Sequence, residues 1–128
     1  MVNYNGTIQE SSAVLIESNR GFLVGDAVFE TIKVVNNKVL FLEDHYFRLM
    51  ASMRICRMEI PMLFTMEYFE EQIIRLIASF PQNHSFRIRF SVYRAGAGFY
   101  APVSNEVEFI ITATPLQQDV YQIEKEQY

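Results

Sequence analysis

Arginines are the residues of this sequence whose spacing most suggests chemistry. Arg87 and Arg89 are two residues apart in an alternating stretch, so both guanidinium groups leave the same face of one predicted strand. Arg94 follows at the end of that strand. The planar guanidinium fork is well suited to binding a carboxylate, so one interpretation is capture of an anionic ligand. The other interpretation is ion pairing with acidic residues of the sheet, for which the candidates are Glu30, Glu106 and Glu108.

A second predicted strand, Ala27–Val35, also carries polar residues on one face. Phe29, Thr31 and Lys33 alternate with a face that is apolar except for Glu30. Two interpretations are open. The strand could be a solvated edge strand with Lys33 in water, or the three residues could line a pocket beside the arginines of the other strand.

A third group lies in a predicted helix. His45, Arg48 and Ser52 are spaced i, i+3 and i+7, which places them on one stripe. The stripe is either a solvated helix face or an anion site, for instance for phosphate. Two histidines and one cysteine, Cys56, are too few for a convincing zinc site, so no metal is expected.

Composition limits the class of protein. The chain has 128 residues, one domain's length, and half of them are hydrophobic, which is enough for a real core. A net charge of −4 argues against nucleic acid as a partner, which requires a basic surface. No apolar run approaches the roughly 20 residues of a membrane span, and the N-terminus lacks the pattern of a signal peptide. With a single cysteine, these features favour a soluble cytoplasmic protein that binds no membrane.

The elements that must position these residues follow from turn signals and periodicity. Asn5-Gly6 and Asn36-Asn37 predict hairpin turns, and Thr65 is a candidate N-cap of a helix. The predicted strands are Val2–Tyr4, Thr7–Gln9, Leu15–Glu17, Ala27–Val35, Lys38–Leu42, Phe86–Arg94 and Val107–Thr114, and the predicted helices are Glu43–Met58 and Met66–Ser79. Pro115 is expected to end the last strand. The fold class is therefore α+β, an antiparallel sheet with two consecutive helices packed on one face as a two-layer sandwich, which leaves the other face free.

Three segments together resemble a known family. RGFLVGDAVFETIKV, LEDHYFRLMAS and RIRFSVYRAGAG are similar to the small N-terminal domain of class-IV aminotransferases, which are pyridoxal-phosphate enzymes of fold type IV. The family includes branched-chain aminotransferases, D-amino-acid aminotransferases and 4-amino-4-deoxychorismate lyase, and the resemblance covers roughly Asn3 to Leu116. It implies that Arg48 binds the phosphate of pyridoxal 5'-phosphate and that Phe29 lies against the substrate, with Thr31 and Lys33 on the same face. It further implies that Arg94, and more loosely Arg89, hold a substrate carboxylate.

One family feature has no match here. Family members hold the cofactor as a Schiff base to a lysine, and none of the three lysines, Lys33, Lys38 and Lys125, fits that position. Residues 1–116 are therefore expected to be the small domain, and residues 117–128 a linker or the start of a second domain that carries the lysine. No catalytic residue is assigned within the chain, which should not catalyse alone.

The resemblance leaves the reaction and the substrate open. It implies a homodimer that acts on an amino-acid or aminodeoxychorismate substrate, by transamination or by a lyase reaction. The glycine-rich stretch after Arg94 resembles lyase-like members, and Phe29 in place of a tyrosine counts against the D-amino-acid branch. The alternative is a stand-alone, non-catalytic module that binds a small anion or dimerises.

Overall fold

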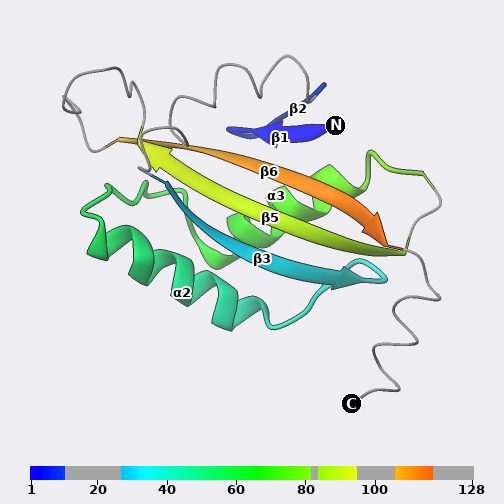
Figure 1. Ribbon diagram of the computed structural model, residues 1–128, viewed down its shortest axis with the longest axis horizontal. Helices are drawn as coiled ribbons and strands as arrows, with labels where there is room; N and C mark the ends of the chain where they lie inside the picture. The colour runs from blue at the N-terminus through cyan, green and yellow to red at the C-terminus, as the bar shows by residue number, and fades with distance from the viewer. Residues whose placement is uncertain (11–26, 82–83, 95–105, 117–128) are drawn as a thin grey trace.

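Six antiparallel strands form a single sheet in the computed structural model, which describes residues 1–10, 27–81, 84–94 and 106–116. The strand order is β2-β1-β6-β5-β3-β4, so the N-terminal hairpin pairs with the last strand of the chain. The long strands β3, β5 and β6 curve side by side through the middle of the molecule (Figure 1). The bounds are β1 (Val2–Tyr4), β2 (Thr7–Gln9), β3 (Ala27–Val35), β4 (Lys38–Val39), β5 (Ser85–Arg94) and β6 (Val107–Leu116).

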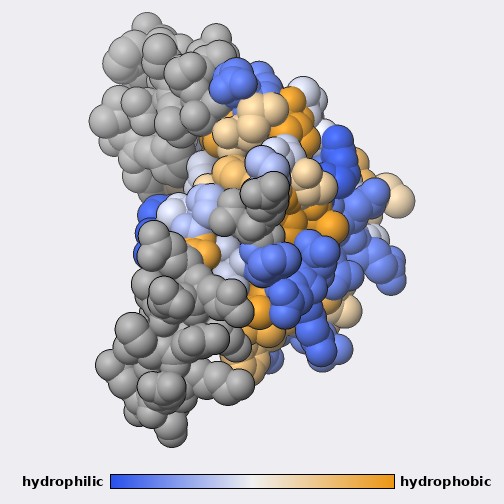
Figure 2. All heavy atoms as spheres, turned by 90° about the vertical axis from the view of Figure 1, so that its right-hand side faces the viewer, coloured by the Kyte–Doolittle hydropathy of each residue, from blue (hydrophilic) through white to orange (hydrophobic). Residues whose placement is uncertain are grey.

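Two helices, α2 (Leu42–Ile55) and α3 (Met66–Ile77), cover one face of the sheet. In Figure 1, α3 lies behind the strands and α2 runs below β3. The hydroxyl of Thr65 accepts a hydrogen bond from the backbone N–H of Tyr68 at 3.1 Å, so the predicted N-cap of α3 is confirmed. In the view of Figure 2, hydrophilic residues gather on the right-hand side of the molecule. The predicted α+β class, with two helices on one face of an antiparallel sheet, is confirmed. Neither helix is long and apolar enough to cross a membrane.

The core lies between the helices and the sheet. Phe69 of α3 stacks on Phe90 of β5 with ring centroids 4.8 Å apart, and Phe90 stacks on Phe109 of β6 at 5.3 Å. Aliphatic side chains of β3 and β5, such as Ile32 and Ile88, are at most 1% exposed beside them. Because a buried Phe, Leu or Ile side chain contributes roughly 1.5–3 kcal/mol, this layer holds the sheet against the helices and fixes which strand face is open.

Turn chemistry explains where the chain reverses. Asn5 and Gly6 have φ angles of 52° and 92°, and Asn36 and Asn37 have 50° and 63°, so both hairpins turn through left-handed residues as predicted. Asn3 is fully buried and ties the first hairpin to α3, because its Nδ2 donates to the carbonyl and the side-chain oxygen of Gln72 at 3.0 and 2.9 Å.

Some predicted bounds were wrong, each for a local reason. The return strand ends at Val39, because Phe41 has a left-handed φ of 55° and turns the chain into α2. Helix α2 ends at Ile55 and is followed by Arg57 with a φ of 57°. Strand β6 continues through Pro115, which pairs with Phe86, because β1 pairs with residues 110–112 only and needs no N–H from Pro115. The predicted strand at residues 15–17 lies outside the described residues.

Candidate functional site

Strand β3 divides the candidate residues between the two faces of the sheet. Phe29, Thr31 and Lys33 point to the face without helices, while Glu30 points toward α2. The alternation predicted from sequence is therefore confirmed. The residues predicted to line the substrate pocket therefore lie on one side of β3. Arg48, the predicted phosphate-binding residue, lies on the other side.

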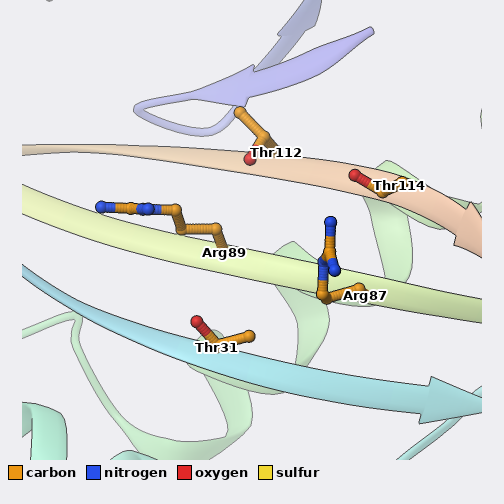
Figure 3. A pocket seen from close by; sticks show the side chains of 5 residues that line it. All are labelled: Thr31, Arg87, Arg89, Thr112 and Thr114. Carbon is orange, nitrogen blue, oxygen red and sulfur yellow. The ribbon is translucent and has the colours of Figure 1, made fainter.

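On the open face, the pairing register sets polar residues in two rows across the sheet. Thr31 lies opposite Arg89, which lies opposite Thr112 of β6. Two residues along the strands, Lys33 lies opposite Arg87, and Arg87 opposite Thr114. The two polar faces therefore lie side by side, as one of the two interpretations of this strand requires. Figure 3 shows the hollow that they line, about 340 Å³ in volume, whose walls are Thr31, Arg87, Arg89, Thr112 and Thr114.

Arg89 is oriented by an aromatic ring. Its Cζ lies 3.8 Å from the centroid of the Phe29 ring, a distance at which the guanidinium is attracted to the ring face. Phe29 is 49% exposed, which is unusual for a phenylalanine and leaves part of its surface available to a ligand. Figure 3 shows the Arg89 side chain extended along β5.

On the helix face, the Glu30 carboxylate binds two residues of α2. His45 Nδ1 lies 2.7 Å from Glu30 Oε1, and Arg48 Nε donates to Oε1 and Oε2 at 3.0 and 3.2 Å. The side chains of Glu30 and His45 are 10% and 12% exposed, whereas that of Arg48 is 59% exposed. The stripe on α2 is therefore not a fully solvated helix face, because His45 is nearly buried. Glu30 binds His45 and Arg48 and is not the partner of Arg87 or Arg89.

Hydrogen-bonding roles in this cluster determine what Arg48 has left to offer. A carboxylate only accepts, so His45 Nδ1 must carry the proton that it shares with Glu30. That nitrogen then cannot accept from Arg48 Nη2, which lies 3.4 Å away. With Nε directed to Glu30, no described residue accepts a hydrogen bond from the two Nη groups of Arg48. Glu30 therefore orients a guanidinium whose outer edge can bind an anion.

Arg94 is not brought together with Arg89. It shares the helix-facing side of β5 with buried Phe90 and Val92, and its Nη2 donates to the backbone carbonyl of Cys56 at 2.5 Å. This orientation could have been predicted from the sequence, because Arg94 is two residues after Val92 and side chains two residues apart in a strand share a face. The loop that follows, residues 95–105, lies outside the described residues.

A buried tyrosine of the open face was not singled out from the sequence. Tyr93 is 4% exposed and packs with Val2 and Ile110. Burial, then a hydrogen bond with Tyr4 and the nearby Glu108 carboxylate, raise the pKa of the Tyr93 hydroxyl far above its ordinary value. The Tyr4 hydroxyl also donates to Glu108 at 3.0 Å, so Glu108 takes part in this cluster. The only sequence signal was the position of Tyr93 on the polar face.

Metal ligands do not gather in the parts of the chain that the structure describes. No group of three or more His, Cys, Asp or Glu side chains there could hold a metal ion. Arginine and threonine therefore dominate the chemistry of the open face, and an arginine held by a carboxylate dominates that of the other side.

One comparison identifies the family of the chain, and the solved structures share its fold. The family model for class IV amino-transferases matches residues 27–127. Among solved structures, branched-chain aminotransferase from Thermoproteus uzoniensis with norvaline is 21% identical, with a TM-score of 0.73 over 91% of this chain and 40% of that one. The enzyme from Thermobaculum terrenum in its pyridoxal-phosphate form is 24% identical, with a TM-score of 0.71 over 94% of this chain and 41% of the other. The Escherichia coli enzyme is 21% identical, with a TM-score of 0.72 over 90% and 39%. No curated protein matches the sequence. The chain spans about 40% of the length of these structures.

Proposed function

Because this chain belongs to the class IV aminotransferase family, we propose that residues 1–116 are the small domain of a pyridoxal-phosphate enzyme of amino-acid or aminodeoxychorismate metabolism. In this proposal the domain supplies a phosphate-binding arginine, Arg48, and one wall of the substrate pocket. Residues 117–128 lead into a second domain. The whole enzyme is a cytoplasmic homodimer.

The observation that carries the proposal is the orientation of Arg48 by Glu30. A cofactor phosphate needs fixed hydrogen-bond donors at an accessible position. Arg48 meets both conditions, because Nε is bound to a nearly buried carboxylate while 59% of the side chain stays exposed. The residues present therefore fit a phosphate group: the Nη donors of Arg48 would hold it, and Glu30 and His45 would keep the guanidinium in place.

Substrate would lie along the open face of β3. Phe29 offers exposed ring surface for an apolar group, and Arg89, held over that ring, offers a guanidinium for a carboxylate. Thr31 and Lys33 complete the wall. For Arg94 to hold a carboxylate, it must exchange its hydrogen bond to Cys56 for one to substrate. Pyridoxal phosphate, when bound, would supply the electron sink that stabilises negative charge at the substrate carbon.

Turnover is not expected of the 128-residue chain. Lys33 lies mid-strand opposite Arg87 and Lys38 lies in the short strand β4, and we assign neither of them, nor Lys125, to the covalent role that the cofactor requires. Transaminase or lyase activity of the pure chain with added pyridoxal phosphate would contradict this assignment. In a form that includes the lysine domain, pyruvate released from aminodeoxychorismate identifies a lyase, and amino transfer to 2-oxoglutarate identifies a transaminase.

The phosphate role of Arg48 can be tested on the chain itself. Pyridoxine 5'-phosphate carries the cofactor's phosphate but no aldehyde, so it cannot react with lysines, and pyridoxine is its control without phosphate. Calorimetric titration should show roughly tenfold tighter binding of the phosphorylated compound, as expected for a charge-assisted hydrogen bond. Arg48→Gln should remove this preference.

The matched control is Arg54→Gln, which removes an exposed arginine from the same helix. It should keep the preference for the phosphorylated compound. A preference that survives Arg48→Gln would refute the proposal and favour the second candidate, a stand-alone module that binds small anions on its open face. That candidate is supported by the arginines and threonines of the hollow.

A further inference from the structure

The first hairpin of the chain contains a residue pair that is prone to a spontaneous covalent change. Asn5 is the only asparagine of the sequence that is followed by a glycine. In such a pair the backbone nitrogen of the glycine can attack the side-chain carbonyl carbon of the asparagine, because glycine has no side chain to hinder the approach. Asn5 is exposed at the turn between β1 and β2, so water can reach it.

The reaction, a deamidation, has two steps and needs no reactant except water. The Gly6 nitrogen forms a bond to Cγ of Asn5, the bond from Cγ to Nδ2 breaks, and Nδ2 leaves as ammonia with the proton from Gly6. Water then hydrolyses the succinimide ring that results. Hydrolysis of the new bond to Cγ gives aspartate. Hydrolysis of the original peptide bond gives isoaspartate, in which the main chain runs through the side chain and is one carbon longer.

The fold binds the nitrogen that would attack. The N–H of Gly6 donates to Oδ1 of Asn3 at 2.9 Å. Asn3 is fully buried, and its Nδ2 donates to the carbonyl and the side-chain oxygen of Gln72, which fixes the position of Oδ1. Attack requires Gly6 to give up its bond to Asn3, and this would leave a buried acceptor without a donor.

The side chain that would be attacked is bound as well. Oδ1 of Asn5 accepts a hydrogen bond from the backbone N–H of Phe109 at 2.7 Å, and the Asn5 N–H donates to the Phe109 carbonyl at 3.0 Å. The Gly6 carbonyl accepts from Arg75 Nη1 at 2.9 Å. The two reacting groups are therefore held by β1, β6 and α3, and they can meet only after the hairpin has opened.

We propose that Asn5 is a deamidation site which the folded hairpin keeps unreactive, and that opening of the hairpin converts Asn5 permanently to aspartate or isoaspartate. Isoaspartate lengthens the main chain at the turn. The bond from Gly6 to Asn3 and the pairing of β1 with β2 then cannot both be restored. The inference goes beyond the proposed function and is independent of it, because none of these residues is assigned there to cofactor or substrate.

Mass spectrometry of the chain tests the inference. The chain is incubated at mildly alkaline pH in buffer and in guanidinium chloride, and fragmentation of the tryptic peptide of residues 1–20 locates the mass increase at Asn5. Conversion in buffer should be at least about a hundredfold slower than in denaturant. Asn3→Ala should raise the rate in buffer about thirtyfold and leave the rate in denaturant unchanged. Asn37→Ala, an equivalent change in the other hairpin, should leave both rates unchanged.

Conversion of the wild type in buffer as fast as in denaturant, or faster, would overturn the inference. The faster rate would mean that the Phe109 N–H activates the Asn5 carbonyl instead of fixing it. A rate in buffer that Asn3→Ala does not change would also overturn it. Hydrogen exchange of the Gly6 amide, read by NMR, needs no variant: exchange should be slowed at least about a hundredfold relative to the unfolded chain, and an unprotected amide would refute the inference.

Discussion

Replacing Glu30 by glutamine is the sharpest test of how Arg48 is positioned. Glutamine keeps the size of the side chain and one oxygen acceptor but removes the charge. Glu30 Oε1 accepts from both His45 and Arg48, whereas Oε2 accepts only from Arg48, at 3.2 Å. If the amide oxygen takes the place of Oε1, the amide nitrogen faces Arg48 Nε, and two donors meet.

The expected loss follows from the burial of each partner. The bond to His45 joins two side chains that are about nine-tenths buried and is 2.7 Å long. A charge-assisted bond of this kind contributes ~1.5–3 kcal/mol, and the neutral bond to glutamine about half of that, so about 1 kcal/mol is lost. Arg48 is 59% exposed, and a solvent-screened pair contributes roughly 0.5 kcal/mol. Glu30→Gln should therefore lower the free energy of unfolding by about 1.5 kcal/mol.

Urea unfolding followed by far-ultraviolet circular dichroism measures this change, and the slope of the transition should stay constant. Glu59→Gln is the matched control, because Glu59 is exposed between the two helices, and its effect should stay within about 0.5 kcal/mol. The same Glu30 variant should weaken the preference for pyridoxine 5'-phosphate, because Arg48 is no longer held. A Glu30 variant that matches the Glu59 control, or that is more stable than the wild type, would refute the reasoning.

Two further substitutions test the open face and the first hairpin. The raised pKa of Tyr93 means that the folded chain keeps a proton which the unfolded chain loses above about pH 10, so stability should fall as the pH rises beyond that value. Tyr93→Phe should make this fall shallower by up to about 1.4 kcal/mol per pH unit in urea titrations at about pH 8, 10 and 11, and an unchanged slope would contradict the assignment. Asn3→Ala removes two donated bonds to Gln72 and one accepted from the Gly6 N–H at 2.9 Å, and should cost about 2–3 kcal/mol in urea unfolding. A loss below about 0.5 kcal/mol would mean that these bonds do not fasten the hairpin.

Local signals were enough to predict most of the fold. The period-2 alternation of residues 27–35 gave the strand with its observed bounds, and left-handed asparagines gave both described hairpins. The facing of Thr31 and Arg89 followed from the same alternation once the strands were neighbours. The pairing of β1 with β6 could not be predicted in this way, because it joins residues about a hundred positions apart.

The partners of the charged residues could not be predicted without knowing that α2 packs on β3. The sequence offers Glu30 as a partner for the arginines of β5, but Glu30 lies on the opposite face of β3, where it binds His45 and Arg48. The alternation in the sequence shows which face of β3 carries Glu30, but it does not show that α2 packs on that face. Arg94 shows the reverse case, because the alternation along its strand already placed it on the helix side, away from Arg89.

The division of residues along β3 explains how one small domain could serve two parts of a ligand. Strand β4 pairs only with Val34 and Val35, so within the described residues the earlier part of β3 forms the edge of the sheet. At that edge, alternate residues reach both faces: Phe29 and Thr31 on the open side, and Glu30 with Arg48 on the helix side. A molecule that lies across the edge can therefore place a phosphate at Arg48 and a carboxylate at Arg89 without burial in the sheet. Under the proposed function, the edge strand β3, more than either face alone, is the feature that joins cofactor and substrate.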